Sequence, residues 1–360
     1  FYLNMQINSF NSKIFIEPVI GSEMAELVKG LEPHGIFILV DENTREHCLP
    51  HIEQLFSREK VHVMEMGQGE ESKRIDAVVD IWNWLQAEGA DSNSLLIGLG
   101  GGMLLDVAGF AAATFKRGIQ IVNIPTTLLS MVDASVGGKT GVNLNGYKNH
   151  VGVFRSPGYV FISPVFLKTL SHRQLYAGWA EMIKHGFIQS RGHFDQLLFS
   201  EPERLPEGEL ARLIRDSVDI KNYYVTRDPY EKGLRRALNF GHTVGHALES
   251  LAMKKRQSLL HGEAVAYGML CAYWLSMQLQ GAGEAPYNRL KEYVDRHYPV
   301  FQVEASDQEE LYRYLLQDKK NRKGRVNFTL LREVGYPVID QYVDEQVIAG
   351  CLKAVFYTSQ

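Results

Sequence analysis

The feature that most constrains the fold is an alternation of short β-branched segments with helical segments over the first 170 residues. Hydrophobic patterning predicts strands in segments 13–19, 35–43, 60–67, 94–102, 119–127 and 158–164. Helical patterns lie between some of them, at 72–90 and 103–118. Alternating strands and helices typically form a mainly parallel sheet covered by helices, so an α/β fold is expected for this region.

From about residue 172 the strand signal nearly disappears and amphipathic stretches follow one another. Helices are predicted over Arg173–Gln189, Glu207–Tyr224, Asn239–Met253, Gly262–Leu279 and Pro286–Arg296. A short strand pair at 325–340 precedes a terminal helix. The sequence therefore predicts an α/β nucleotide-binding domain at 1–171 and a mostly α-helical domain at 172–360, with a ligand cleft between them.

Charge excludes some classes of partner. The chain has 38 Lys and Arg residues against 42 Asp and Glu residues, a formal net charge of -4. This balance argues against nucleic acid or an anionic membrane as the main partner. We expect the basic groups that matter to gather around an anionic small molecule.

The three cysteines, Cys48, Cys271 and Cys351, are widely spaced and fit neither a disulfide framework nor a zinc knuckle. A reducing compartment is the simplest inference. The longest apolar run, at 264–277, is too short to cross a bilayer. We therefore expect a cytoplasmic protein.

A glycine cluster between a predicted strand and a predicted helix indicates a phosphate site. Gly98, Gly100, Gly101 and Gly102 would let backbone N–H groups approach an anion at the helix N-terminus. The spacing differs from the usual dinucleotide fingerprint, although Asp41 ends an earlier strand where it can accept from ribose hydroxyls. A plain tight turn is the alternative.

Segment 123–154 is rich in glycine and polar side chains and is expected to form one loop-and-turn region. Its lysines, Lys139 and Lys148, lie among amides and hydroxyls on glycine-rich backbone. Such a surface suits a phosphorylated or carboxylated substrate. The alternative is a surface loop with solvated lysines.

Two histidines, His242 and His246, lie one helical turn apart, beside Asn239 and Glu249. Spacing of this kind presents metal ligands or acid–base groups on one helix face. A partly buried pair with a capping role is the alternative. Spacing alone would make both histidines ligands.

Five motifs occur in the order of a known family. They are "LGGGMLLDVAGF", "VDASVGGKTGVN", "AEMIKHG", "LNFGHTVGHALE" and "HGEAVAYGM". Together they resemble 3-dehydroquinate synthase, from about Asp41 to the "DKKNRKG" segment. The sequence departs from the family pattern at Tyr147, Ser163 and Ser171.

The resemblance implies a catalytic Zn²⁺, for which Co²⁺ can substitute, held by Glu181, His242 and His261. It places His246 beside the substrate instead of the metal. It also implies bound NAD, and a homodimer in which Arg117 reaches the partner subunit's site. The residues implied for NAD are Asp41, Asn43, Glu70, Lys73, Gly101, Gly102, Asp106, Thr126, Thr127, Lys139, Lys148, Thr169 and Leu170. Those implied for an anionic small-molecule substrate are Asp133, Lys139, Lys148, Asn149, Lys184, Lys221, Glu231, Arg235, Asn239, His246 and Lys320.

The implied reaction converts 3-deoxy-D-arabino-heptulosonate 7-phosphate to 3-dehydroquinate and phosphate, in the shikimate pathway. Its stages are transient oxidation by NAD, phosphate elimination, re-reduction and intramolecular aldol closure, with zinc polarising the substrate hydroxyls. The alternatives are another sugar-phosphate cyclase, a metal-dependent polyol dehydrogenase, and a non-catalytic ligand sensor that retains the fold.

Overall fold

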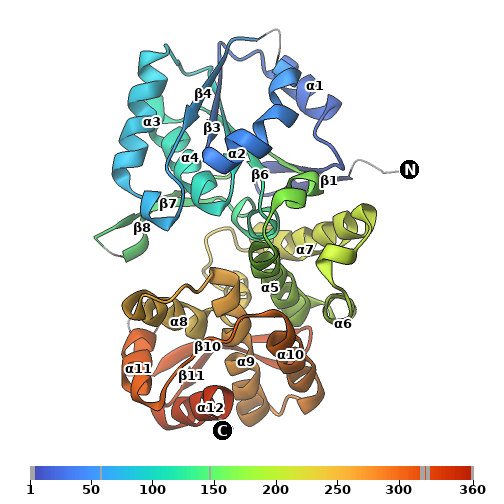
Figure 1. Ribbon diagram of the computed structural model, residues 1–360, viewed down its shortest axis with the longest axis vertical. Coiled ribbons are helices and arrows are strands. Elements are labelled where there is room, and N and C mark those ends of the chain that lie inside the picture. Colours follow the sequence, from blue (N-terminus) through green and yellow to red (C-terminus); the bar gives the residue numbers. More distant parts are fainter. Residues whose placement is uncertain (1–4, 57–58, 146, 317–320, 322–324, 358–360) are drawn as a thin grey trace. The chain divides into compact units, whose positions relative to one another are not determined.

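The computed structural model describes residues 5–56, 59–145, 147–316, 321 and 325–357 (Figure 1). The chain divides into two compact units. The first comprises Phe1–Ser171 with Pro206–Tyr230, and the second comprises His172–Leu205 with Glu231–Gln360. The expected division after residue 171 coincides with one of these boundaries. However, helix α7 (Glu207–Arg227), expected in the second domain, groups with the first unit.

The first unit is built on a seven-stranded sheet in the order β1-β2-β9-β6-β5-β3-β4. Only the β1–β2 pair is antiparallel; the other neighbouring pairs are parallel. The strands are β1 (Met5–Ser9), β2 (Ser12–Ile16), β3 (Ile36–Val40), β4 (Val61–Glu65), β5 (Leu95–Gly100), β6 (Gln120–Pro125) and β9 (Tyr159–Ile162). The mainly parallel sheet and each of the six predicted strands are present.

The order of the strands reverses at β3. From β3 the chain adds β4 on one side, and then β5, β6 and β9 on the other. In open α/β sheets, ligands bind where the carboxyl ends of the strands flank such a reversal. The edge formed by the ends of β3 and β5 is therefore the expected binding edge of this unit.

Helices cover the sheet on its apolar surfaces. They are α1 (Ser22–Leu31), α2 (Glu42–His47), α3 (Ile75–Ala87) and α4 (Gly102–Thr114), together with α7. Helix α4 is apolar around most of its circumference because it is buried, with Leu104, Val107 and Ala111 in the same core as Leu39 and Leu96 of the sheet. A 3-10 turn at Pro164–Thr169 ends the segment.

The prediction of one loop-and-turn region at 123–154 is wrong for its second half. Strands β7 (Lys139–Leu144) and β8 (Tyr147–Phe154) form a separate two-stranded antiparallel sheet. Glycine and polar residues concealed the strands because β8 is largely exposed and has little apolar alternation.

The second unit is mostly helical. Its helices are α5 (His172–Gln189), α6 (Arg191–Phe199), α8 (His242–Lys255), α9 (His261–Gln280), α10 (Glu284–His297), α11 (Gln308–Leu316) and α12 (Glu345–Phe356). An antiparallel ribbon of β10 (Val326–Glu333) and β11 (Tyr336–Val343) packs against α9. Leu248, Leu275, Phe328 and Leu352 belong to its core.

Helix α8 begins three residues later than the predicted Asn239. The preceding residues form a 3-10 turn, η8 (Leu234–Asn239), and Gly241 then adopts a left-handed φ of 80°. A helical periodicity does not register such a break, because the apolar residues continue through it.

Within the described residues, no helix is long and apolar enough to cross a membrane. Cys48, Cys271 and Cys351 are free and buried, as expected from their spacing.

Candidate functional site

Three helices of the second unit bring one carboxylate and two imidazoles together. Oε1 of Glu181, on α5, lies 3.4 Å from Nε2 of His242, at the start of α8. The same oxygen lies 3.4 Å from Nε2 of His261, at the start of α9. All three ligand atoms lie within 4.8 Å of one another. The structure thus assembles the three residues that the resemblance implied for the metal.

Two glycines of α9 allow these helices to converge. A Cβ on Gly262 would lie 1.8 Å from the carbonyl oxygen of Ala177 in α5, one turn before Glu181. A Cβ on Gly268 would lie 1.9 Å from the carbonyl oxygen of Gly241, next to His242. Any larger residue would push the helices apart and separate the ligands.

The cluster fits a tetrahedral divalent ion. Ligands about 2.0–2.1 Å from Zn²⁺ lie about 3.4 Å from one another in a tetrahedron. Oε1 of Glu181 is buried and makes no hydrogen bond with the described residues. A buried carboxylate oxygen of this kind requires a partner, and a cation at the centre of the cluster would supply it.

The far sides of both imidazoles are held in the way typical of metal ligands. Nδ1 of His242 lies 3.3 Å from the carbonyl oxygen of Phe240, and Nδ1 of His261 lies 3.3 Å from Oε2 of Glu249. These acceptors favour the N–H at Nδ1, leaving the Nε2 lone pair directed at the cluster.

The electrostatics of the cluster follow from its burial. Burial disfavours the Glu181 carboxylate, but Lys184 and His242 outweigh that effect and hold its pKa well below the ordinary value. Burial and Lys184 lower the pKa of His242 to about 3. Burial also disfavours His261 protonation, yet the neighbouring carboxylates of Glu181 and Glu249 outweigh that effect and raise its pKa to about 10.

His246 differs from His242 although the two share a helix face. Its side chain is exposed, and its ring centroid lies 5.4 Å from that of His242 and 6.0 Å from that of His261. One of its ring nitrogens lies within 4.8 Å of ligand atoms of Glu249 and His261, in a second group that could hold a metal ion. Among the described residues, no group that could hold a metal ion combines His242 with His246, so the pairing predicted from spacing is replaced by the pairing of His242 with His261 around Glu181.

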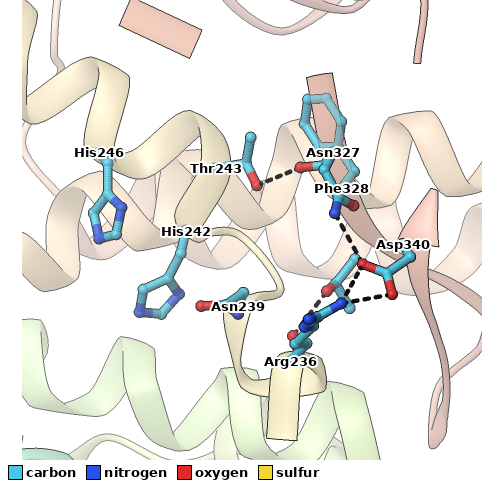
Figure 2. A pocket seen from close by; sticks show the side chains of 9 residues that line it. Arg236, Asn239, His242, Thr243, His246, Asn327, Phe328 and Asp340 are labelled. Carbon is cyan, nitrogen blue, oxygen red and sulfur yellow. Dashed lines mark hydrogen bonds and ion pairs between the residues drawn. The ribbon is translucent and has the colours of Figure 1, made fainter. Parts of the chain in front are cut away.

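Polar residues implied for the substrate adjoin the ligands in this unit. Lys184 is buried beside Glu181 and forms an ion pair with it. Arg235 is buried in η8, and the Asn239 amide donates to Oε1 of Glu231 at 2.8 Å. Figure 2 shows Asn239, His242 and His246 lining one small cavity. Glu231 adopts a left-handed φ of 55°, a strained conformation often retained at functional positions.

The first unit gathers nucleotide-type residues at the strand reversal. Asp41 follows β3, and its Oδ1 caps α2 by accepting from the Thr44 N–H at 2.8 Å. Gly101 follows β5 and is the N-cap of α4. A Cβ on Gly102 would lie 2.9 Å from Cβ of Ala134, so the backbone is closely covered here. Thr126 and Thr127 follow β6 along the same edge. The side-chain amide of Asn43, in α2, donates to Oε1 of Gln68 at 3.2 Å.

A second group centres on Lys73. This buried ammonium donates to Oδ2 of Asp106 at 2.6 Å and to Oδ1 of Asn149. Burial raises the pKa of Asp106 to about 6, against the opposing effect of Lys73. Glu70 joins the same group through Asn143, whose amide donates to Oε1 of Glu70 at 2.7 Å and accepts from the Asn149 N–H at 2.8 Å. Four implied residues thus form one network.

The remaining implied residues are distributed differently. The Lys221 ammonium, from α7, donates to Oδ1 of Asp133 at 2.6 Å. Lys139 and Lys148 are exposed on the β7–β8 ribbon, and Thr169 and Leu170 lie at the end of the 3-10 turn. Lys320 lies outside the described residues.

Arg117 is separated from the glycine cluster of its own unit. It follows the C-terminus of α4, whereas Gly101 and Gly102 lie at the N-terminus. A helix of 13 residues is about 20 Å long. Arg117 is exposed, with a left-handed φ of 68°.

Some supporting residues escaped sequence reasoning. Glu263 is buried, accepts from the Leu260 N–H at 2.8 Å and forms an ion pair with Arg173. It thereby fixes the start of the helix that carries His261. Its place two residues after a helix-start histidine was the available signal. The ion pair between Arg236 and Asp340 left no signal in the sequence, because the two residues are far apart along the chain.

Comparison with known proteins shows which family this chain resembles. The profile of the 3-dehydroquinate synthase N-terminal domain matches residues 63–177, and that of the C-terminal domain matches residues 178–321. A 3-dehydroquinate synthase of Parabacteroides distasonis is 43% identical over 340 residues, which is 94% of this chain and 96% of that protein. One from Methylacidiphilum infernorum is 40% identical over 322 residues, 89% and 88% of the two chains.

Solved structures share the fold. A 2-epi-5-epi-valiolone synthase from Streptomyces hygroscopicus subsp. jinggangensis, with NAD⁺ and Zn²⁺ bound, has a TM-score of 0.84 at 25% identity, covering 98% of this chain and 99% of that one. A 2-deoxy-scyllo-inosose synthase, complexed with carbaglucose-6-phosphate, NAD⁺ and Co²⁺, has a TM-score of 0.82 at 25% identity, covering 98% and 100%. From the two domain profiles and the identity to these relatives over nearly the whole length, the chain belongs to the 3-dehydroquinate synthase family.

Proposed function

We propose that this protein converts 3-deoxy-D-arabino-heptulosonate 7-phosphate to 3-dehydroquinate and phosphate. The observation that carries the proposal is the cluster of Glu181, His242 and His261, with its histidines held at Nδ1, in a chain whose relatives are 3-dehydroquinate synthases. The overall conversion removes only phosphoric acid, so it is neutral in redox terms.

The ligand cluster would hold one divalent cation, Zn²⁺ in the first instance. A bound cation of this type acts as a Lewis acid that acidifies substrate hydroxyls. Related cyclases have been solved with Zn²⁺ or Co²⁺, which supports the choice of a divalent metal. Glu181 would neutralise part of the charge of the ion, and Phe240 and Glu249 would orient the two imidazoles.

The glycine edge of the first unit would hold NAD⁺, which supplies a temporary hydride acceptor. Gly101 and Gly102 would admit the pyrophosphate to the N-terminus of α4, where backbone N–H groups and the helix dipole favour an anion. Asp41 would accept from a ribose hydroxyl with its second carboxylate oxygen, since the first caps α2. The bound NAD⁺ in both related cyclases supports this assignment.

The chain's cations would bind the anionic groups of the substrate. Lys184 and Arg235 are buried in the second unit close in sequence to metal ligands, and Lys221 is buried in the first. Buried cations bind anions more strongly than solvated ones because less water competes. Asn239, held by Glu231, would present its amide oxygen to a substrate hydroxyl.

A homodimer would give Arg117 a role. Its position beyond the far end of α4 keeps it from the glycine cluster of its own subunit. An exposed, conformationally strained arginine is suited to reach the site of a second copy.

Another sugar-phosphate cyclase activity is the principal alternative, because two such enzymes share the fold. Their 25% identity is well below the 43% found with a 3-dehydroquinate synthase, which favours the dehydroquinate reaction. A polyol dehydrogenase would produce NADH in proportion to its substrate.

The deciding assay supplies the heptulosonate phosphate, NAD⁺ and Zn²⁺ to the purified protein. Dehydroquinate and phosphate should appear in equal amounts, with no net NADH at 340 nm. Stoichiometric NADH would favour a dehydrogenase. Turnover of a different sugar phosphate alone would favour another cyclase.

A further inference from the structure

A short segment of the second unit carries two of the proposed active-site residues between two anchored ends. Residues 236–243 run from the middle of η8 into the first turn of α8 and include Asn239 and His242. The β10–β11 ribbon contacts both ends of this segment, as Figure 2 shows.

The first anchored end is Arg236. Its Nη1 donates to Oδ1 and Oδ2 of Asp340 at 3.0 and 2.9 Å. Its backbone carbonyl accepts from Oγ1 of Thr329 at 2.9 Å. Side chain and main chain of Arg236 are therefore held by different strands of the ribbon.

The second anchored end is Thr243, directly after the metal-ligand candidate His242. Its Oγ1 donates to the backbone carbonyl of Asn327 at 3.2 Å. The Asn327 amide in turn donates to Oδ1 of Asp340 at 2.9 Å. One carboxylate thus connects both ends of the segment.

Asp340 occupies an unfavourable backbone conformation. Its φ is 56°, within strand β11, where Ile339 and Asp340 together oppose Thr329 in a bulge. A left-handed conformation is unfavourable for a residue with a Cβ, and glycine avoids that cost. Aspartate at this position therefore lowers stability, but it places a carboxylate beside Arg236 and Asn327.

The anchored groups and the active-site residues line one cavity of about 20 Å³, roughly the size needed for one water molecule. Its lining includes Arg236, Asn239, His242, Thr243 and Asp340. With so little space, displacing the ribbon displaces the segment directly.

We infer that Asp340 and Arg236 are positioning residues, which fix His242 and Asn239 by clamping residues 236–243 against the β10–β11 ribbon. The Asp340 clamp comprises Arg236, Thr243, Asn327, Thr329 and Asp340. The inference rests on the proposed function for the roles of His242 and Asn239. Neither Asp340 nor Arg236 belongs to the ligand cluster of Glu181, His242 and His261.

The test measures Zn²⁺ affinity by chelator competition and the visible spectrum of the Co²⁺-loaded full-length protein. Asp340→Asn removes the charge but retains a residue that tolerates left-handed φ. Asp340→Gly removes the carboxylate and relieves the left-handed φ, so this variant is expected to fold even if Asp340→Asn does not. Thr243→Val releases the other end.

The matched control is Asp344→Asn, which breaks the exposed ion pair between Asp344 and Arg325 four residues beyond the clamp. It should leave both metal readouts unchanged. Each clamp variant should weaken Zn²⁺ binding by about tenfold, in the range found for groups that orient metal ligands. The Co²⁺ absorption bands should shift, and kcat should fall while NAD⁺ affinity stays constant.

A purely structural role predicts a different result. If the clamp variants lower the urea midpoint but retain wild-type Zn²⁺ affinity and Co²⁺ spectrum, the inference is wrong. If the unmodified protein forms no dehydroquinate, the proposed function fails. The Zn²⁺ and Co²⁺ titrations still decide the clamp in that case, because they require no turnover.

Discussion

Nδ1 of His261 lies 3.3 Å from Oε2 of Glu249, on the side of the ring away from Glu181. His261 therefore has a carboxylate on each side, that of Glu181 as the fellow candidate ligand and that of Glu249 as an orienting acceptor. Carboxylates in this second position fix the tautomer of a metal-binding histidine and increase its basicity.

Glu249→Gln should consequently weaken Zn²⁺ binding by about 10- to 100-fold with little change in the fold. The Zn²⁺ affinity of each variant is measured by competition between a chelator and the metal-free protein for Zn²⁺. Glu292→Gln, at an exposed ion pair on α10, is the control and should bind Zn²⁺ normally. Equal affinities for the two variants would remove Glu249 from the metal site.

Arg235→Lys should impair substrate binding or turnover by roughly 10- to 100-fold, because a charge-assisted hydrogen bond contributes about 1.5–3 kcal/mol. Lysine retains the charge but not the planar fork that binds carboxylate or phosphate through two bonds. NAD⁺ and substrate titrations of the variant separate the two ligands, and exposed Arg212→Lys serves as the reference. A large loss of NAD⁺ affinity with normal substrate affinity would contradict the assignment.

Gly102→Ala should weaken NAD⁺ binding and lower stability by about 1–3 kcal/mol, because the new Cβ would lie 2.9 Å from Cβ of Ala134. Gly30→Ala is the matched control, since a Cβ there meets nothing within 4 Å. Isothermal titration with NAD⁺ and urea unfolding give the two readouts. Wild-type NAD⁺ affinity in Gly102→Ala would argue against the glycine edge as the nucleotide site.

Glu17 should make the stability of the protein depend on pH. It is 3% exposed, and burial, reinforced by Glu23, raises its pKa from 4.5 to about 7. Between these values the folded form binds a proton that the unfolded chain releases, so the stabilising contribution is complete below pH 4.5 and is lost as the pH rises through 7.

Glu17→Gln should therefore be more stable than the wild type at pH 8, by up to about 3 kcal/mol, and nearly equal to it at pH 4.5. Urea midpoints at the two pH values measure the difference. Exposed Glu26→Gln should follow the wild type at both. Parallel pH profiles for Glu17→Gln and the wild type would refute the assignment.

The strands of the first unit were predictable because burial on both faces produces continuous apolar runs, as in Ile36–Val40. The β7–β8 ribbon was not, since exposed strands lack that pattern. Local periodicity likewise missed the turn at Gly241, where a left-handed residue interrupts an otherwise apolar helical sequence.

Sequence reasoning likewise predicted only part of the candidate site. Helical spacing identified His242 and His246 as neighbours but could not decide between His246 and His261, because the decision depends on Glu181, contributed by another helix. Family resemblance supplied that answer. The Asp340 clamp joins residues about a hundred positions apart, and a single sequence contains no record of such a contact.

The grouping of Pro206–Tyr230 with the first unit has a consequence for synthesis on the ribosome. The polypeptide passes from one unit to the other three times, after residues 171, 205 and 230, so no single cut in the gene separates the two units. Glu181 is synthesised before the segment Pro206–Tyr230, whereas His242 and His261 are synthesised after it. The first unit's last helix is therefore synthesised before the three candidate ligands can meet, and capture of a metal by them would be a late event in biogenesis.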